Sequence, residues 1–137
     1  MILHELGHAL FIKIFGGKIL SIGFGTGEHL IQIKKFFIKK NSWLSGRIFW
    51  SSNKKMNNFK QFFIYIGGPL INILSATLIW IFGDSEYADW YRGYIIYSYL
   101  IGIFSLIPLT YNDGVASDGL RLLNLIKKIY RFGYLKA

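Results

Sequence analysis

Residues 61–82 read QFFIYIGGPLINILSATLIWIF and contain no charged side chain. A second charge-free stretch, GYIIYSYLIGIFSLIPLTY, covers residues 93–111. Each has about the twenty residues that a helix needs to cross the hydrocarbon core of a bilayer. The composition agrees, because 53% of the 137 residues are hydrophobic and only 17% are charged, which is too apolar for an ordinary soluble domain. We therefore expect membrane helices at 61–82 and 93–108, the second ending near Pro108.

A third apolar segment, residues 1–16, opens the chain and is too short to cross a bilayer. No breaker or cap stands before it, so we expect a membrane helix that begins upstream of the given sequence. The predicted fold class is an α-helical polytopic membrane protein with three membrane helices, the first truncated at the chain start. A small β-hairpin region and a C-terminal amphipathic helix complete this expectation.

The remaining segments give the predicted organisation of a single membrane-embedded core, residues 1–137. The glycine-rich part of 17–60 alternates like strands and predicts a β-hairpin that turns near Thr26-Gly27. Lysines crowd residues 34–60, so the positive-inside rule places this segment and the C-terminus in the cytoplasm. Residues 109–131 predict a ligand-bearing loop followed by an amphipathic helix on the membrane surface.

The formal net charge of +9 could also indicate nucleic-acid binding. The lysines flank the apolar stretches as topology signals do, and no nucleic-acid-binding motif accompanies them. The sequence therefore predicts a lipid bilayer as partner and no nucleic acid, in an integral protein of a bacterial cytoplasmic membrane.

The chemistry of the first segment lies in HELGHAL, residues 4–10. On a helix, His4 and His8 are neighbours on one face and can bind one ion, while Glu5 is rotated by about 100° and lies beside that ion. There Glu5 can act as general base toward a metal-activated water. Two histidines can also be merely structural in a helix, but ionisable groups in apolar sequence are costly and usually mark function. With no cysteine in the chain, we expect Zn²⁺ held by imidazole and carboxylate.

A catalytic zinc keeps three protein ligands and one open position, so a third ligand is needed. Asp113 and Asp118 are the acids late in the chain, and both follow Pro108. Turn residues after a proline can deliver either carboxylate to the zinc, and at this point both remain candidates. His29, in the predicted hairpin, is expected at the surface and is the next candidate.

Three motifs, HELGHAL, GGPLINILSA and SLIPLTYNDGVASDGLRL, together resemble the site-2 protease family of intramembrane zinc metalloproteases. They span residues 4–122 in the order that the family shows. The resemblance implies a zinc metalloendopeptidase that cleaves a membrane-spanning protein or hydrophobic peptide in or near its membrane segment. It implies zinc bound by His4, His8 and the aspartate of the last motif, with Glu5 as catalytic base and Asn72 near the active site.

Of the two aspartates, Asp118 is the predicted ligand. Asp113 lies in an Asn-Asp-Gly turn, which gives it a sufficient structural role. Asp118 begins the predicted amphipathic helix and precedes a glycine and an arginine, as in the family. The alternative function is a non-catalytic membrane binding or immunity-type protein that retains the motif, although an intact Glu5 argues against such decay.

Overall fold

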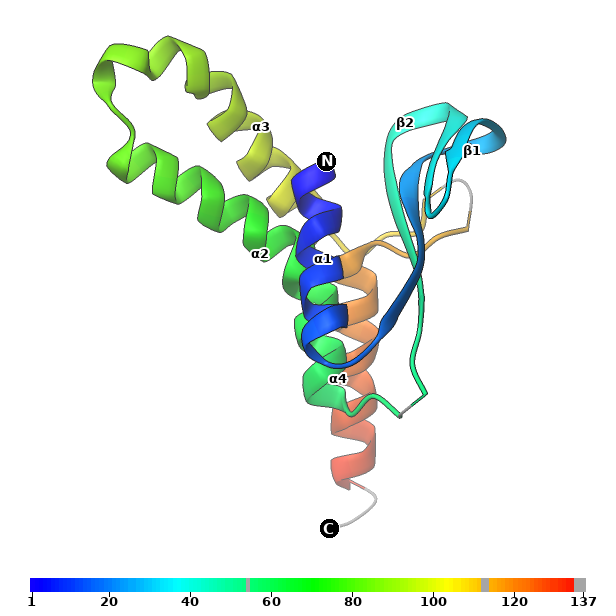
Figure 1. Cartoon of the computed structure of the whole chain (residues 1–137). Helices are drawn as coiled ribbons and strands as arrows, with labels where there is room; N and C mark the ends of the chain where they lie inside the picture. Colours follow the sequence, from blue (N-terminus) through cyan, green and yellow to red (C-terminus); the bar gives the residue numbers. More distant parts are fainter. Residues whose placement is uncertain (54, 112–113, 135–137) are drawn as a thin grey trace.

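The computed structural model describes residues 1–53, 55–111 and 114–134, without the side chains of 42–44 and 132–134. In these residues the chain forms four α-helices, a short 3₁₀ helix and a two-stranded antiparallel sheet (Figure 1). The elements, in chain order, are α1 (Ile2–Ile14), β1 (Lys18–Ile33), β2 (Phe36–Ser51), α2 (Asn58–Phe82), η1 (Ser85–Tyr87), α3 (Ala88–Ser105) and α4 (Asp118–Tyr134).

The prediction of a polytopic protein with three membrane helices is wrong. Within the described residues, only α2 is long and apolar enough to cross a membrane. The 13 residues of α1 reach about 20 Å at 1.5 Å per residue, short of a bilayer core of about 30 Å. The 18 residues of α3 begin at Ala88 and include Asp89 and Arg92, so the helix takes in polar residues outside the expected span and ends at Ser105. The fold is a small domain that combines helices with a sheet.

The hairpin forms, but its turn is not near Thr26-Gly27. Strand β1 continues through that region to Ile33, and the chain reverses at Lys34-Lys35, where Lys34 has a positive φ of 51°. Gly25 and Gly27 have φ of 88° and 81° and accompany shifts of register within the sheet. As a result, β2 residues 36–38 pair with two parts of β1, residues 22–24 and 31–33.

Helices α1 and α2 approach each other to backbone contact, which brings the HELGHAL motif against α2. A side chain at Gly7 would collide with the Gly67 carbonyl, and one at Gly67 would collide with the backbone of Gly7. Only glycine at both positions permits this approach. Ile12, Met56 and Ile64 form a buried core at the interface of these helices. Aromatic and aliphatic side chains of α1, the hairpin and α2 cover this core.

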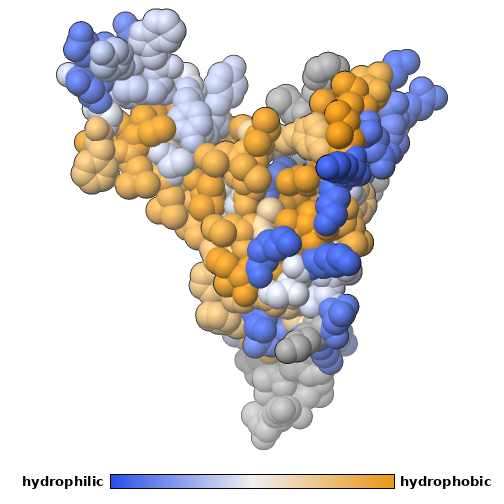
Figure 2. Space-filling model, in the orientation of Figure 1, coloured by the Kyte–Doolittle hydropathy of each residue, from blue (hydrophilic) through white to orange (hydrophobic). Residues whose placement is uncertain are grey.

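Helix α2 changes direction along its length (Figure 1). It contains Pro69, which cannot donate to the preceding turn and commonly kinks a helix. The first part of α2 lies beside α1, and the later part forms a limb with α3, tied by hydrogen bonds between the hydroxyls of Tyr94 and Ser75 and between those of Tyr99 and Thr77. Hydrophobic side chains gather along this limb (Figure 2).

Candidate metal centre

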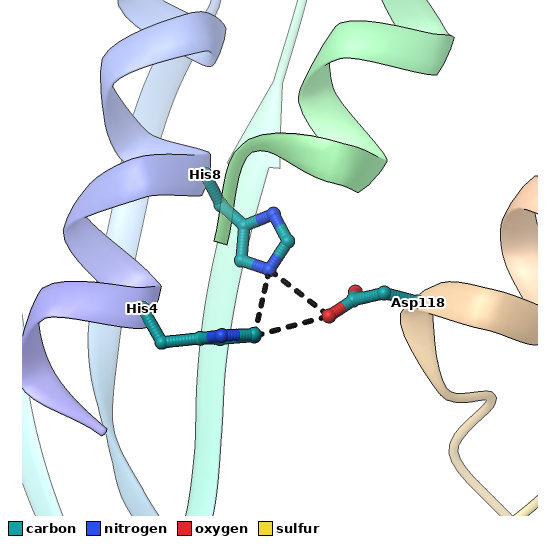
Figure 3. Close-up of side chains that lie close together, drawn as sticks. All are labelled: His4, His8 and Asp118. Atoms are coloured by element: carbon teal, nitrogen blue, oxygen red, sulfur yellow. Dashed lines mark hydrogen bonds and ion pairs between the residues drawn. The ribbon is translucent and has the colours of Figure 1, made fainter. Parts of the chain in front are cut away.

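Three of the side chains that the sequence singles out converge between α1 and α4 (Figure 3). His4 Nε2 and His8 Nε2 lie 3.0 and 3.2 Å from Asp118 Oδ2, and 3.2 Å from each other. Both histidines are buried, and Asp118 is nearly so. Three potential ligand atoms thus form an almost equilateral triangle, although Asp118 is 114 positions from His4 in the sequence.

The dimensions of this triangle fit a zinc ion. Ligand atoms bound at 2.0–2.1 Å in a tetrahedral arrangement are separated by about 3.3 Å. The observed separations of 3.0–3.2 Å are close to that value. Two imidazoles and one carboxylate also match the donor set of a catalytic zinc with a fourth position left open.

Backbone and side-chain contacts hold both rings in the orientation that metal binding needs. His8 Nδ1 lies 2.6 Å from the Ile64 carbonyl oxygen, which can only accept, so Nδ1 carries the proton and the Nε2 lone pair faces the triangle. The Asn72 side-chain nitrogen lies 3.5 Å from His4 Nδ1. With the amide turned so that its oxygen takes this place, Asn72 accepts a hydrogen bond from Nδ1–H and leaves His4 Nε2 free as well. Such outer contacts fix the tautomer of ligand histidines.

Ser117 holds Asp118 in place at the first residue of α4. Its hydroxyl accepts hydrogen bonds from the amides of Leu109 and Leu120 and donates one to the Ile107 carbonyl, at 2.7–3.1 Å. The bond from Leu120 is an N-cap, and the other two join the start of α4 to the segment that follows α3. Ser117 is only 2% exposed. The carboxylate of Asp118 is therefore carried on a fixed helix end.

The protonation state of Asp118 suits an anionic metal ligand. Burial alone would raise the pKa of Asp118, but hydrogen bonds from Nε2 of His4 and His8, which form only while a proton rather than a metal occupies those nitrogens, outweigh that effect and hold the pKa well below its usual range. The group is therefore a carboxylate at neutral pH.

Glu5 lies on the adjacent face of α1 and is only 5% exposed. Strand β2 passes directly over it, since a side chain at Gly46 would collide with the Glu5 carboxylate. Burial is the main reason that the pKa of Glu5 is raised to about 7. The carboxyl group is thus held beside the candidate metal ligands, in a place from which bulk water is largely excluded.

Gly68 of α2 forms the back wall of the triangle. A Cβ at this position would lie 2.6 Å from His4 Nε2 and closer still to His8 Nε2. We expect Gly68→Ala to weaken zinc binding by tenfold or more, because at least one imidazole must move, and disturbed support of ligands has effects of about 10–100-fold. A zinc titration against a chromophoric chelator measures this affinity.

Gly93→Ala is the matched control, since a Cβ at Gly93 on α3 meets nothing within 4 Å. Alanine favours helix formation over glycine by about 1 kcal/mol, so neither change should unfold its helix. Equal zinc affinities in the two variants would contradict the role of Gly68.

The structure separates the remaining candidates from this cluster. His29 is exposed on the hairpin, 5.7 Å from the ring of Phe37, and does not join the three ligands. The predicted turn residue Asp113 lies outside the described residues. Sequence reasoning expects Gly67-Gly68-Pro69 and Asn72 to form a packed wall of the site, but it missed Ser117 and the Ile64 carbonyl. Only Ser117 had a usable signal, because a serine directly before a helix start indicates an N-cap.

Comparison with known proteins gives one informative match. No protein-family model matches the chain. No solved structure matches it either. The uncharacterized membrane protein YwmF of Bacillus subtilis (strain 168) is 27% identical over 135 residues, which cover 96% of this chain and 82% of YwmF. The name of this relative and the length and apolar composition of α2 support a membrane location.

Proposed function

We propose that this protein is a zinc-dependent endopeptidase of the site-2 protease type, which hydrolyses a peptide bond in or near the membrane segment of a protein or hydrophobic peptide. The observation that carries the proposal is the convergence of His4, His8 and Asp118 at zinc-ligand spacing, with the Glu5 carboxylate beside them. The order of the three sequence motifs supports the same class of enzyme.

Each residue has a distinct task in this proposal. His4, His8 and Asp118 hold the zinc, which when bound supplies a Lewis acid that polarises a peptide carbonyl and lowers the pKa of water. Glu5 accepts a proton from the attacking water and returns it to the leaving amine. Asn72 is a positioning residue, since its amide lies against His4 Nδ1.

Helix α2 connects the proposed zinc site with the membrane. Helix α2 carries both Gly68, behind the metal ligands, and an apolar length that can cross a bilayer. A substrate helix in the bilayer would therefore lie near the zinc ligands, but its backbone must unwind locally before a peptide carbonyl can be attacked, because helical carbonyls are already hydrogen bonded.

We expect the protein, purified in neutral detergent and dialysed, to retain about one zinc per chain, measured by inductively coupled plasma mass spectrometry. The same preparation should cleave members of a library of fluorogenic membrane-segment peptides. Chelation should stop cleavage, and added zinc should restore it. A preparation that retains zinc but cleaves nothing would favour the non-catalytic alternative, and one that takes up no zinc would refute the metal centre.

A further inference from the structure

A cavity of about 310 Å³ lies on the hairpin and is formed by residues other than the metal ligands. Its lining includes His29, Lys35 and Lys39 as nitrogen donors, and Phe36, Phe37 and Phe49 as aromatic surface. No acidic residue contributes to this lining. We propose that this cavity binds the phosphate of an anionic phospholipid, with the glycerol and upper acyl chain resting on the aromatic rings.

The charge of the cavity favours an anion. Lys35 is exposed and Lys39 is partly buried, with its ammonium 5.6 Å from the centre of the Phe37 ring. Among the described residues, neither lysine forms an ion pair with an aspartate or a glutamate within 4 Å. Both ammonium groups can therefore turn to a ligand phosphate without giving up a carboxylate partner.

The aromatic part of the cavity is ordered by packing. Phe37 is only 3% exposed, and its ring lies 5.7 Å from His29 and 6.1 Å from Phe49. Phe36 pairs with both Ile22 and Ile33, so the lining is built on the part of the sheet where β2 is paired on two sides. A ligand with an apolar portion gains more from these rings than a free anion would.

The surroundings of the cavity indicate a lipid as the source of the phosphate. Leu30, Ile31 and Ile33 are about half exposed or more, and Ile33 reaches 64%. They occupy the end of β1 that pairs with residues 36–38, next to the cavity. Aliphatic side chains beside lysines suit the boundary between acyl chains and anionic headgroups, where the aliphatic groups enter the hydrocarbon and the lysines meet phosphate.

The test uses the full chain in neutral detergent and dihexanoyl-phosphatidylglycerol as probe, with binding followed by native mass spectrometry at fixed salt. We expect saturable binding of one lipid per chain. A lysine at an anionic lipid surface contributes about 1 kcal/mol, or about fivefold, so K35Q/K39Q should weaken binding by roughly 25-fold. K35R/K39R, which keeps both charges, should bind as the original chain does.

The matched control is K18Q/K34Q, which removes two lysine charges from the same hairpin but none from the cavity lining. It should change the lipid affinity by less than about threefold, because it weakens only the general electrostatic attraction between the hairpin and the anionic lipid. Equal weakening by the two glutamine variants would overturn the proposal. Displacement of the lipid by an equal concentration of sodium phosphate, or equally tight binding of dihexanoyl-phosphatidylcholine, would overturn it as well.

Discussion

Asp118→Ala should abolish zinc binding and peptide cleavage together. The change removes one of three ligands and leaves two buried imidazoles without the carboxylate that contacts both of them. We expect zinc content to fall from about one ion per chain to near zero after dialysis, and cleavage to fall below detection. Metal analysis and the peptide assay, run on the same preparation, give both values.

Asp113→Ala is the comparison that the sequence suggests, because Asp113 stands in the other aspartate-glycine pair. It should keep zinc and activity. Loss of zinc in Asp113→Ala with retention in Asp118→Ala would refute the ligand assignment and leave the protease proposal in place. If both variants retained zinc, neither aspartate would be a ligand and the third ligand would lie elsewhere.

Glu5→Gln should separate metal binding from chemistry. The amide has nearly the shape of the carboxylate, so it fits under Gly46 and leaves His4 and His8 undisturbed. An amide does not accept the proton from water, and loss of a general base typically lowers kcat by 10²–10⁴-fold. We expect zinc content to be unchanged and cleavage to fall by at least about 100-fold.

Glu28→Gln, an exposed acid on the hairpin, controls for the change of charge and should retain full activity. Zinc loss in Glu5→Gln would show instead that Glu5 supports the ligands. Full activity in that variant would mean that another group accepts the proton.

The residues of the candidate site were more predictable than the fold around them. The spacing of His4 and His8 is local, and a helix fixes it without reference to the rest of the chain. Asp118 could be preferred over Asp113 because Asp118 stands at a predicted helix start, whereas Asp113 stands in a predicted turn that already explains its presence. The contacts that orient the ligands are tertiary, and no sequence pattern indicates that the Ile64 carbonyl meets His8.

The errors in the fold came from signals with two structural meanings. The length of a charge-free stretch does not show where a helix begins. Helix α3 begins early enough to include the charged residues Asp89 and Arg92. Glycines that adopt positive φ occur at turns and also at bends within a strand, so Gly25 and Gly27 alone do not distinguish a turn near Thr26-Gly27 from a bend in β1. The actual turn, Lys34-Lys35, has no glycine or proline to mark it.

The separation of 114 positions between His4 and Asp118 has a consequence for biosynthesis. A ribosome adds about 5–20 residues per second, so the two histidines emerge roughly 5–25 s before the aspartate. During that interval the nascent chain carries only part of the triangle. A centre with these three ligands is complete only after α4 has begun to leave the ribosome, so under the proposed function the growing chain carries no complete catalytic site until synthesis has nearly reached the last helix.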